Sequence, residues 1–153
     1  YIGSHMVRML RDNGYRPVVV DNLATGHAQA AQGVDFREGD IGDRDFMASV
    51  FREFQPRCVM HFAASSLVGE SMQMPGKYWR NNLVQTLSLI EGMLGHGVRQ
   101  FIFSSTAAVY GNPVRVPIPE DHPTAPINPE VVENEVSSEL PVDEPPAADE
   151  SNA

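Results

Sequence analysis

The sequence predicts an α/β fold in which helices cover a parallel β-sheet. Short apolar runs without alternation are typical of strands that are buried on both faces of such a sheet. Between these runs lie longer segments whose apolar residues recur with the period of an amphipathic helix. Strands that alternate with helices favour parallel pairing through helical crossovers. The expected strands span residues 16–22, 34–37, 58–64 and 100–105, and the expected helices span residues 3–14, 44–55 and 76–96.

The first helix and the first strand are predicted by spacing and by a glycine stop. Met6, Val7 and Leu10 recur at helical intervals, and Gly14 follows at a position that commonly ends a helix. The next residues, RPVVVDN, form a short apolar run that ends in Asp21 and its neighbour. Such a run indicates a buried strand with a polar carboxyl end.

The later helices are predicted by apolar stripes, and the strand between them carries a histidine. Residues 44–55 and 76–96 each place apolar side chains on one helical face, as a helix that packs on a sheet requires. His61 lies inside the apolar run CVMHFAA, which favours a satisfied core histidine over a ligand. The stripe residues are Phe46, Val50, Phe51 and Phe54 in the first helix, and Tyr78, Leu83, Leu87, Ile90 and Leu94 in the second.

The negative charge of the chain is concentrated in one segment. The 153 residues include 11 basic and 20 acidic side chains, for a net charge of −9. Residues 130–153 hold eight of the acidic side chains and none of the basic ones, with no aromatic residue and no sustained period. This segment is predicted to be a disordered acidic tail, because it cannot bury enough apolar area to offset chain entropy.

The composition also excludes several classes of partner. Residues 1–129 are nearly neutral and carry no basic stripe, which argues against nucleic acid. No apolar run approaches the roughly 20 residues that cross a bilayer, so we expect no membrane partner. The single cysteine, Cys58, excludes an intramolecular disulfide and favours a reducing, cytoplasmic compartment. The chain begins at Tyr1 rather than Met, and we expect its natural start to be missing or processed.

Polar residues stand at the carboxyl ends of the expected strands, where parallel α/β sheets bind ligands. Asp21 ends the first strand 18 residues after Gly3, which opens the first helix. This spacing is close to the roughly 20 residues between a glycine fingerprint and the acid that binds a ribose. A helix start can also hold a pyrophosphate. Asp40, in the peptide GDIGD, could bind an adenine amino group. An acid at a strand end is more often a turn or cap residue, and these residues alone favour that interpretation.

Six short peptides together resemble the extended short-chain dehydrogenase/reductase family. They are YIGSH, VVVDNLATGH, GDIGD, HFAASSLVGES, YWRNN and FIFSSTAAVYG, and they occur in the family's order and spacing. The resemblance covers residues 1–129 and implies a Rossmann-like doubly wound parallel sheet that forms a partial NAD-binding domain. It also implies that the family's first strand, with two glycines of its phosphate loop, would precede Tyr1. The sheet is therefore expected to be incomplete.

The resemblance implies roles for individual residues. Thr106 matches the Ser or Thr that hydrogen-bonds the reacting hydroxyl of the sugar, whereas Ser66 stands where many relatives have a lysine near the cofactor. No metal site is expected. The cofactor-binding residues that the match implies are Gly3 in the phosphate loop, Asp21 and Asn22 at the adenosine ribose, Asp40 and Ile41 at the adenine, Phe62, Ala63 and Ala64 beneath the cofactor, and Asn82 facing it.

The segments DNL…G, within DNLATG, and SLVGES favour the branch of this family that inverts C4 of a UDP-hexose with the help of NAD. In that branch a tyrosine base, with a lysine four residues later, follows the peptide INP. Here INP is followed by residues 130–134, EVVEN, and the chain has no tyrosine after Tyr110 and no lysine after Lys77. We therefore expect the chain itself to be inactive, with a carboxyl end that has been replaced or misread.

Two alternatives stay open. The first is another extended family member, a sugar-nucleotide dehydratase or a uronate epimerase, although SSTAAVYG lacks the acid pair that a dehydratase would favour beside Thr106. The second is a non-catalytic nucleotide-binding module that has lost its base. The resemblance also implies a homodimeric parent that pairs through two long helices, one of which would be residues 76–96.

A missing first strand would have a structural consequence. That strand is central in the doubly wound order, so its absence would leave the apolar edges of strands 16–22 and 58–64 unpaired. We expect the chain to fold poorly alone, or to close the gap by pairing these two strands directly.

Overall fold

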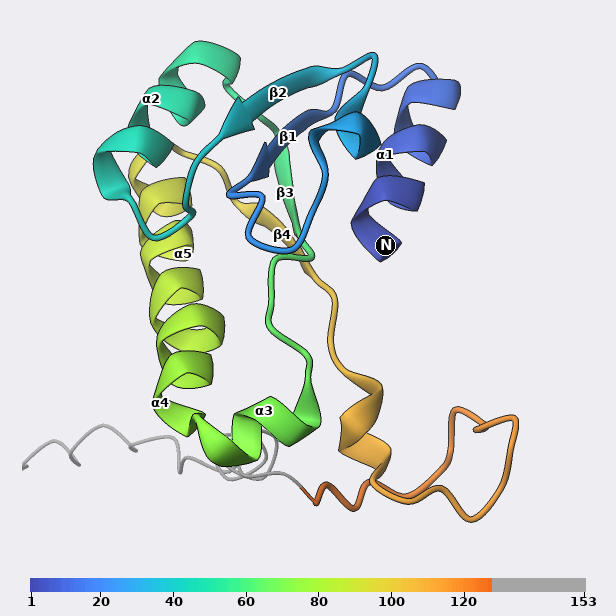
Figure 1. Cartoon of the computed structure of the whole chain (residues 1–153). Helices are drawn as coiled ribbons and strands as arrows, with labels where there is room; N and C mark the ends of the chain where they lie inside the picture. Colours follow the sequence, from blue (N-terminus) through green and yellow to red (C-terminus); the bar gives the residue numbers. More distant parts are fainter. Residues whose placement is uncertain (128–153) are drawn as a thin grey trace, which may run out of the picture. The chain divides into compact units, whose positions relative to one another are not determined.

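The computed structural model describes residues 1–127 and shows the expected alternation of strands and helices (Figure 1). The chain divides into two compact units, of which the first spans Tyr1–Thr106 and the second begins at Ala107. The predicted acidic tail, residues 130–153, lies outside the described residues. Every helix within residues 1–127 is too short or too polar to span a bilayer.

The first unit holds four strands in two separate parallel pairs, so the prediction of a parallel α/β fold is confirmed. Each pair is in register from its first residue to its last. Each observed strand overlaps its predicted range, and three of the four are shorter than predicted. The pairs are β1 (Val18–Asp21) with β2 (Asp35–Glu38), and β3 (Cys58–His61) with β4 (Gln100–Phe103).

The gap between the two pairs stays open. Among the described residues, β1 and β3 each have one hydrogen-bonded neighbour and do not pair with each other. The expectation that these two strands would close the gap by pairing is therefore wrong. The pairs are joined instead by side-chain packing on one face, which buries apolar surface without bringing the two strand edges together.

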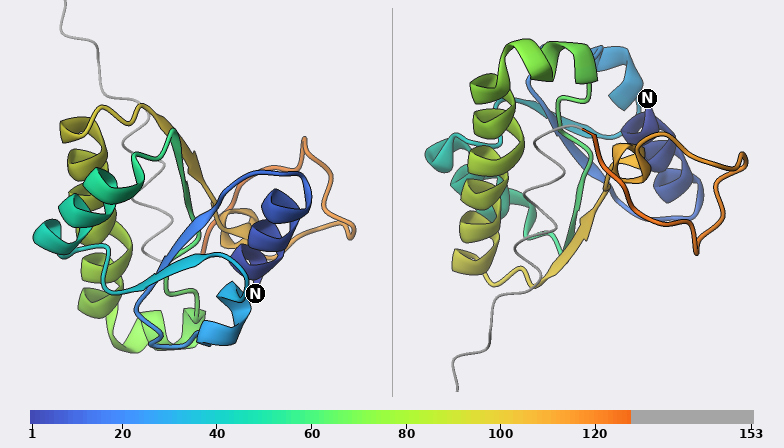
Figure 2. Two further views of the ribbon diagram at one scale, coloured as in Figure 1. Left: turned by 90° about the horizontal axis from the view of Figure 1, so that it is seen from above. Right: turned by 90° about the horizontal axis from the view of Figure 1, so that it is seen from below.

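Helix α2 (Arg44–Phe54) follows β2 as predicted, and the sequence sets both of its ends. Asp43 caps the amino end by accepting a hydrogen bond from the Phe46 amide at 3.0 Å. The helix ends at Gln55, which adopts a left-handed conformation with φ 45°. Helix α1 (Ile2–Asp12), on the other side of the strands in Figures 1 and 2, has no fully buried residue.

The long helix predicted for residues 76–96 is present but is not uniform. It begins as α4 (Pro75–Tyr78), continues through a π-helical segment, η2 (Trp79–Val84), and ends as α5 (Gln85–Gly95). We call residues 75–95 the long helical run. The sequence did not predict the π-helical segment, nor three short elements: η1 (Ala28–Ala31), α3 (Val68–Gln73) and η3 (Ala107–Tyr110). The expectation that the apolar stripe of residues 76–96 faces the sheet is wrong for Leu83, Leu87 and Leu94, which are exposed. The buried side of α5 carries Leu89 and Met93 instead.

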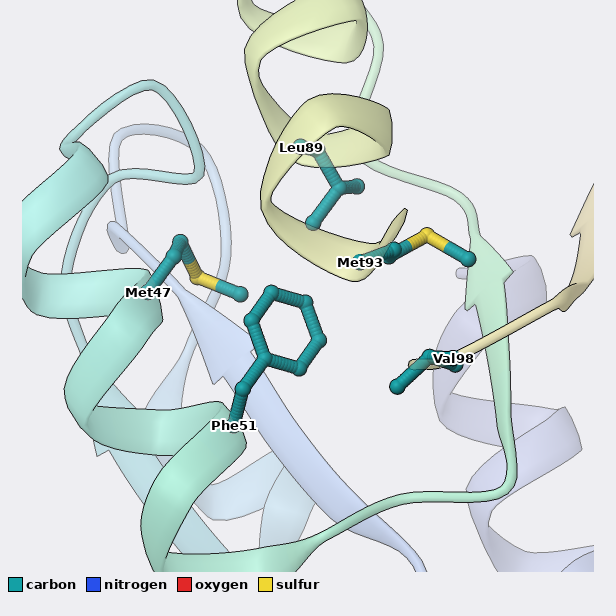
Figure 3. Packing of buried hydrophobic residues seen from close by; sticks show 5 residues of the cluster. All are labelled: Met47, Phe51, Leu89, Met93 and Val98. Atoms are coloured by element: carbon teal, nitrogen blue, oxygen red, sulfur yellow. The ribbon is translucent and has the colours of Figure 1, made fainter. Parts of the chain in front are cut away.

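The core of the first unit lies between α2 and α5, which pack side by side in both Figures 1 and 2. Figure 3 shows the Phe51 ring pointing into the space between the two helices, where it is 2% exposed. Residues from both strand pairs pack against this cluster, including Val20 of β1 and Val59 of β3. The cluster therefore joins the pairs across the open gap. Its fully buried members are Met47, Phe51, Leu89, Met93 and Val98.

His61, the last residue of β3, is buried with both ring nitrogens bonded. It is 4% exposed, its Nε2 lies 2.7 Å from Thr86 Oγ1, and its Nδ1 accepts a hydrogen bond from the Ala63 amide at 3.1 Å. The rings of Phe101 and Phe103 lie beside it. The interpretation of His61 as a satisfied core histidine is confirmed. Burial lowers the pKa of His61 below its ordinary value of 6.5.

The second unit is organised around a buried histidine as well. His122 is 8% exposed, and the edge of the Tyr110 ring meets it with the centroids 5.6 Å apart. The Val114 amide donates to His122 Nε2 at 3.2 Å, and Nδ1 lies 2.8 Å from the Pro123 carbonyl oxygen. Gly111 has φ 58°, and a Cβ built there would lie 1.9 Å from the Ala125 carbonyl oxygen. This turn therefore requires glycine.

Replacing Phe51 with alanine should remove the packing that joins the two strand pairs. We expect the free energy of unfolding to fall by about 3–5 kcal/mol, the usual cost of truncating a buried phenylalanine. The control is Met9→Ala on the exposed face of α1, where the side chain is 61% exposed and the change should stay within about 0.5 kcal/mol. Urea unfolding measures both variants. Equal losses would show that the α2–α5 cluster does not join the pairs.

The stability of the chain should fall as the pH drops below about 6.5. In the folded state His61 stays neutral because its pKa is lowered, whereas the unfolded chain protonates it near its ordinary pKa. The unfolded state therefore binds more protons, and the free energy of unfolding declines by at most about 1.4 kcal/mol per pH unit until the folded pKa is reached.

The measurement is urea unfolding of the wild type, of His61→Asn and of the exposed control His27→Asn between about pH 7.5 and pH 5. We expect the wild type and the His27→Asn variant to share one pH dependence, and the His61→Asn variant to show a shallower one. An identical dependence in all three would contradict the assignment of a neutral buried imidazole.

Candidate functional site

Most of the candidate site residues follow the carboxyl ends of the strands, which lie at the same edge within each parallel pair. On β4 the chain continues beside β3 past its last paired residue, since the Ser104 amide donates to the His61 carbonyl oxygen at 3.1 Å. The exposed Thr106 comes two residues later. Asp21 ends β1 and Asn22 follows it, Asp40 and Ile41 follow β2, and Phe62, Ala63 and Ala64 follow β3.

The structure brings the candidates at the ends of β1 and β2 together. Asn22 Nδ2 donates to Asp40 Oδ2 at 3.3 Å, so these side chains meet across 18 residues of sequence. The Gly39 amide donates to the Asp21 carbonyl oxygen at 3.1 Å, which extends the β1–β2 pairing to this point. The predicted ribose and adenine residues therefore form one cluster.

Both acids also stabilise turns, which was the alternative interpretation of each. Asp21 Oδ1 accepts a hydrogen bond from the Leu23 amide at 2.8 Å, and Asp40 Oδ1 accepts one from the Gly42 amide at 2.8 Å. These bonds fix the carboxylates at the strand ends. The turn role and a ligand role are thus compatible, because a carboxylate oxygen can accept more than one hydrogen bond.

Sequence reasoning missed Gly26, which lies beside Asp21. A Cβ built on Gly26 would lie 3.2 Å from both carboxylate oxygens of Asp21. Glycine therefore leaves the approach to this carboxylate clear. The available signal was the glycine in the turn DNLATG directly after the strand, where close approach of a ligand is one reason for glycine.

The start of α1 lies beside the end of β3. A Cβ built on Gly3 would lie 3.4 Å from Phe62 Cβ, so these two candidates are in contact distance of each other. No side chain caps the first turn of α1, and Ser4 Oγ donates instead to the Tyr1 carbonyl oxygen at 2.7 Å. Free backbone amides at a helix start can bind a phosphate group.

Each of the other candidate residues lies in its own surroundings. Ile41 packs its side chain against the core cluster, so a contact to an adenine would come from its main chain. Asn82 lies in the π-helical segment η2, a kind of element that often marks functional sites. Its side chain pairs with the Ser65 backbone, next to Ala64. Ser66 is exposed.

The site offers hydrogen bonding and backbone dipoles rather than a metal. Within residues 1–127, no group of three or more His, Cys, Asp or Glu side chains could hold a metal ion. The hydroxyl of Thr106 can orient a substrate hydroxyl, but an alcohol cannot serve as a general base at neutral pH. Polar groups at the carboxyl ends of parallel strands are the kind that can bind a nucleotide.

Comparison with curated proteins shows which enzymes the chain resembles. The chain is 48% identical over 129 residues to the UDP-glucose 4-epimerase of Halalkalibacterium halodurans, a match that covers 84% of this chain and 39% of the relative. It is 51% identical over 132 residues to the UDP-glucose 4-epimerase of Streptococcus mutans, a match that covers 84% of this chain and 40% of that relative. The chain thus spans about two fifths of the length of these relatives.

Solved structures give the same result. A UDP-glucose 4-epimerase from Brucella ovis in complex with NAD superposes with a TM-score of 0.79 at 43% identity, covering 90% of this chain and 42% of that one. The enzyme from Thermotoga maritima with UDP-glucose gives a TM-score of 0.76 at 36% identity, covering 90% and 45%. The Rossmann-type fold expected from the resemblance is confirmed.

The family is shown by a model that matches most of the chain. The model described as the NAD dependent epimerase/dehydratase family matches residues 1–132 of the 153. The resemblance drawn from the six peptides is confirmed by this match and by the relatives above. This chain is a member of the NAD dependent epimerase/dehydratase family.

Proposed function

We propose that this chain supplies the NAD-binding part of a UDP-glucose 4-epimerase, an enzyme that interconverts UDP-glucose and UDP-galactose through a 4-keto intermediate. The observation that carries the proposal is the meeting of Asn22 and Asp40 at adjoining strand ends, beside Asp21. A dinucleotide needs its ribose and adenine contacts at that edge. The NAD-binding domain of this proposal comprises residues 1–129, followed by an acidic tail from residue 130.

The residues present fit a dinucleotide. The amides at the start of α1, around Gly3, would hold the pyrophosphate, since they have no side-chain cap. Asp21 and Asn22 would accept and donate hydrogen bonds at the adenosine ribose, and Asp40 with the main chain of Ile41 would bind the adenine. The segment 62–64 and Asn82 would lie along the rest of the cofactor. When bound, NAD supplies the acceptor for the hydride that leaves C4 of the hexose.

The chain supplies only part of the chemistry. Thr106 would hydrogen-bond the C4 hydroxyl of a UDP-hexose and hold it in place. The proton of that hydroxyl needs a base, and the family's tyrosine and lysine have no counterpart here: residues 130–134 read EVVEN. We therefore propose that residues 1–153 bind the nucleotide but do not turn the substrate over. A non-catalytic nucleotide-binding module is the second candidate, and this same feature favours it.

The proposed partner surface lies on the long helical run. Leu83, Val84, Leu87 and Leu94 are large apolar side chains that stay exposed along it. Apolar residues gathered on one exposed helix face are typical of a subunit interface. We propose that the parent protein is a homodimer that uses this face. We also place the protein in the cytoplasm, because its lone cysteine suits a reducing compartment.

The activity is tested in a chimera. The 129 residues of the Halalkalibacterium halodurans relative that match this chain are replaced by the matching residues of this chain. We expect the chimera to convert UDP-galactose to UDP-glucose, and Thr106→Ala to lower its kcat on the order of a hundredfold, as loss of one positioned donor does. The control Thr106→Ser keeps the hydroxyl and should stay within a few-fold.

Two results would contradict this part of the proposal. A folded chimera that binds NAD but has no epimerase activity would favour the binding-module alternative. A Thr106→Ala chimera as active as its parent would remove Thr106 from the substrate site.

The cofactor contact is tested with matched aspartates. Asp21→Asn removes a charged acceptor from the proposed ribose site, whereas Asp35→Asn makes the same change at the other end of the strand pair, where β2 begins. We expect Asp21→Asn to raise the Kd for NAD in the chimera by about tenfold to a hundredfold. Asp35→Asn should leave it unchanged. Equal effects in isothermal titration would contradict the placement of the ribose at β1.

A further inference from the structure

One face of the long helical run binds the segment that follows β3 at three successive points. Tyr78, Asn82 and Thr86 are spaced four residues apart, so their side chains line one side of the helix. Each contacts a different part of residues 61–70. We call these three residues the polar ladder.

The first point of the polar ladder is Thr86, which acts through His61. The Ala63 amide can only donate, so His61 Nδ1, 3.1 Å away, must be the acceptor. The ring proton is therefore on Nε2, which donates to Thr86 Oγ1 at 2.7 Å. Thr86 thus stabilises this tautomer by accepting the Nε2 proton, which leaves Nδ1 as the acceptor for the Ala63 amide. Both side chains are buried.

The second point is Asn82, whose amide group pairs with a single backbone unit. Asn82 Oδ1 accepts from the Ser65 amide at 2.9 Å, and Asn82 Nδ2 donates to the Ser65 carbonyl oxygen at 3.0 Å. Asn81 Nδ2 also donates to Asn82 Oδ1 at 2.9 Å. Two bonds to the N–H and the C=O of one residue fix the orientation of Ser65 as well as its position.

The third point is Tyr78, which is 1% exposed. Its hydroxyl lies 3.0 Å from the Leu67 carbonyl oxygen and 2.8 Å from Glu70 Oε2, so these two acceptors share one hydroxyl proton. Lys77 Nζ donates to the other oxygen of Glu70 at 2.6 Å. These bonds hold the pKa of Glu70 below its ordinary value of 4.5, with Lys77 as the larger cause and Tyr78 next. The carboxylate thus stays ionised and keeps accepting the tyrosine hydroxyl.

The ladder holds the residues proposed to lie beneath the dinucleotide. Alternate residues of the segment, at positions 61, 63, 65 and 67, are each fixed by a side-chain bond. Ala63 and Ala64 are exposed and have no side chain that could anchor them otherwise. Their backbone path therefore depends on the helix behind them.

We propose that Thr86 and Tyr78, acting through His61 and through Leu67 and Glu70, are positioning residues that set the affinity of this edge for the dinucleotide. This inference rests on the proposed function. Neither residue needs to touch the cofactor, because each acts by fixing the segment that does.

The test uses the chimera described above and four substitutions. Thr86→Val removes the acceptor for His61 at nearly constant shape, and Thr86→Ser restores a hydroxyl. Tyr78→Phe removes the hydroxyl that holds Leu67 and Glu70, and Tyr15→Phe makes the same change at a tyrosine that is 65% exposed. The dissociation constant of NAD⁺ is measured by titration at a temperature where all variants are folded. Amide exchange at Ala63 and Ser65, and the imidazole nitrogen shifts of His61, are measured without ligand.

We expect His61 to carry its proton on Nε2 in the wild type. Thr86→Val and Tyr78→Phe should each weaken NAD⁺ binding about tenfold. In Thr86→Val the Ala63 amide should also exchange faster. Thr86→Ser should restore both readings, and Tyr15→Phe should change neither.

Each contrary result has a distinct meaning. A proton on Nδ1 of His61 would overturn the ladder geometry. Faster exchange at Ala63 with unchanged NAD⁺ affinity would overturn the positioning role, because the segment would then be held for another reason. A wild-type chimera that folds but binds no NAD⁺ would overturn the proposed function together with this inference, whereas wild-type binding with unaffected variants would overturn this inference alone.

Discussion

The structure depends on the long helical run, which packs in the core with one face and binds the segment after β3 with another. The apolar face of the long helical run packs against α2 and buries Leu89 and Met93 in the core. Its polar ladder, on Tyr78, Asn82 and Thr86, binds the segment that leads away from β3. Because the two strand pairs share no backbone hydrogen bonds, this helix and α2 are what fix one pair relative to the other. The position of the candidate site follows from that packing.

The elements that a sequence can predict are those with a strong local signal. The apolar runs gave the strands, and the stripe with Val50 and Phe51 gave the buried face of α2. Two differences between the prediction and the structure have tertiary causes. The π-helical turn at 79–84 was not predicted, because its sequence carries no period that distinguishes it from an α-helix. The pairing of β1 with β3, one of two expected outcomes, was expected only because both edges are apolar. That expectation neglected the core cluster, which packs against side chains of both strand pairs while their edges stay unpaired with each other.

For the candidate site, the sequence predicted where residues lie along the strands but not which side chains contact each other. Asp21 and Asp40 could be placed at strand ends from the sequence, but not shown to meet, since the bond between Asn22 and Asp40 depends on the parallel register of β1 and β2. Gly26 had a signal in the turn DNLATG, but its contact with Asp21 and the partners of His61 became visible only in the structure. The motif match assigned Asn82 to the cofactor side, whereas its bonds to Ser65 became visible only in three dimensions.

In the proposed enzyme, nucleotide binding and proton transfer depend on different parts of the structure. Binding groups are spread along one edge of a parallel sheet and depend on backbone geometry, whereas proton transfer needs a single base held at the reacting hydroxyl. A chain can therefore retain the first without the second. The most direct test of this account is a crystal structure of the chimera with NAD. The account predicts the dinucleotide along the carboxyl edge, with its adenosine ribose at Asp21 and its adenine at Asp40. NAD bound away from that edge, with Asp21 and Asp40 facing solvent, would contradict it.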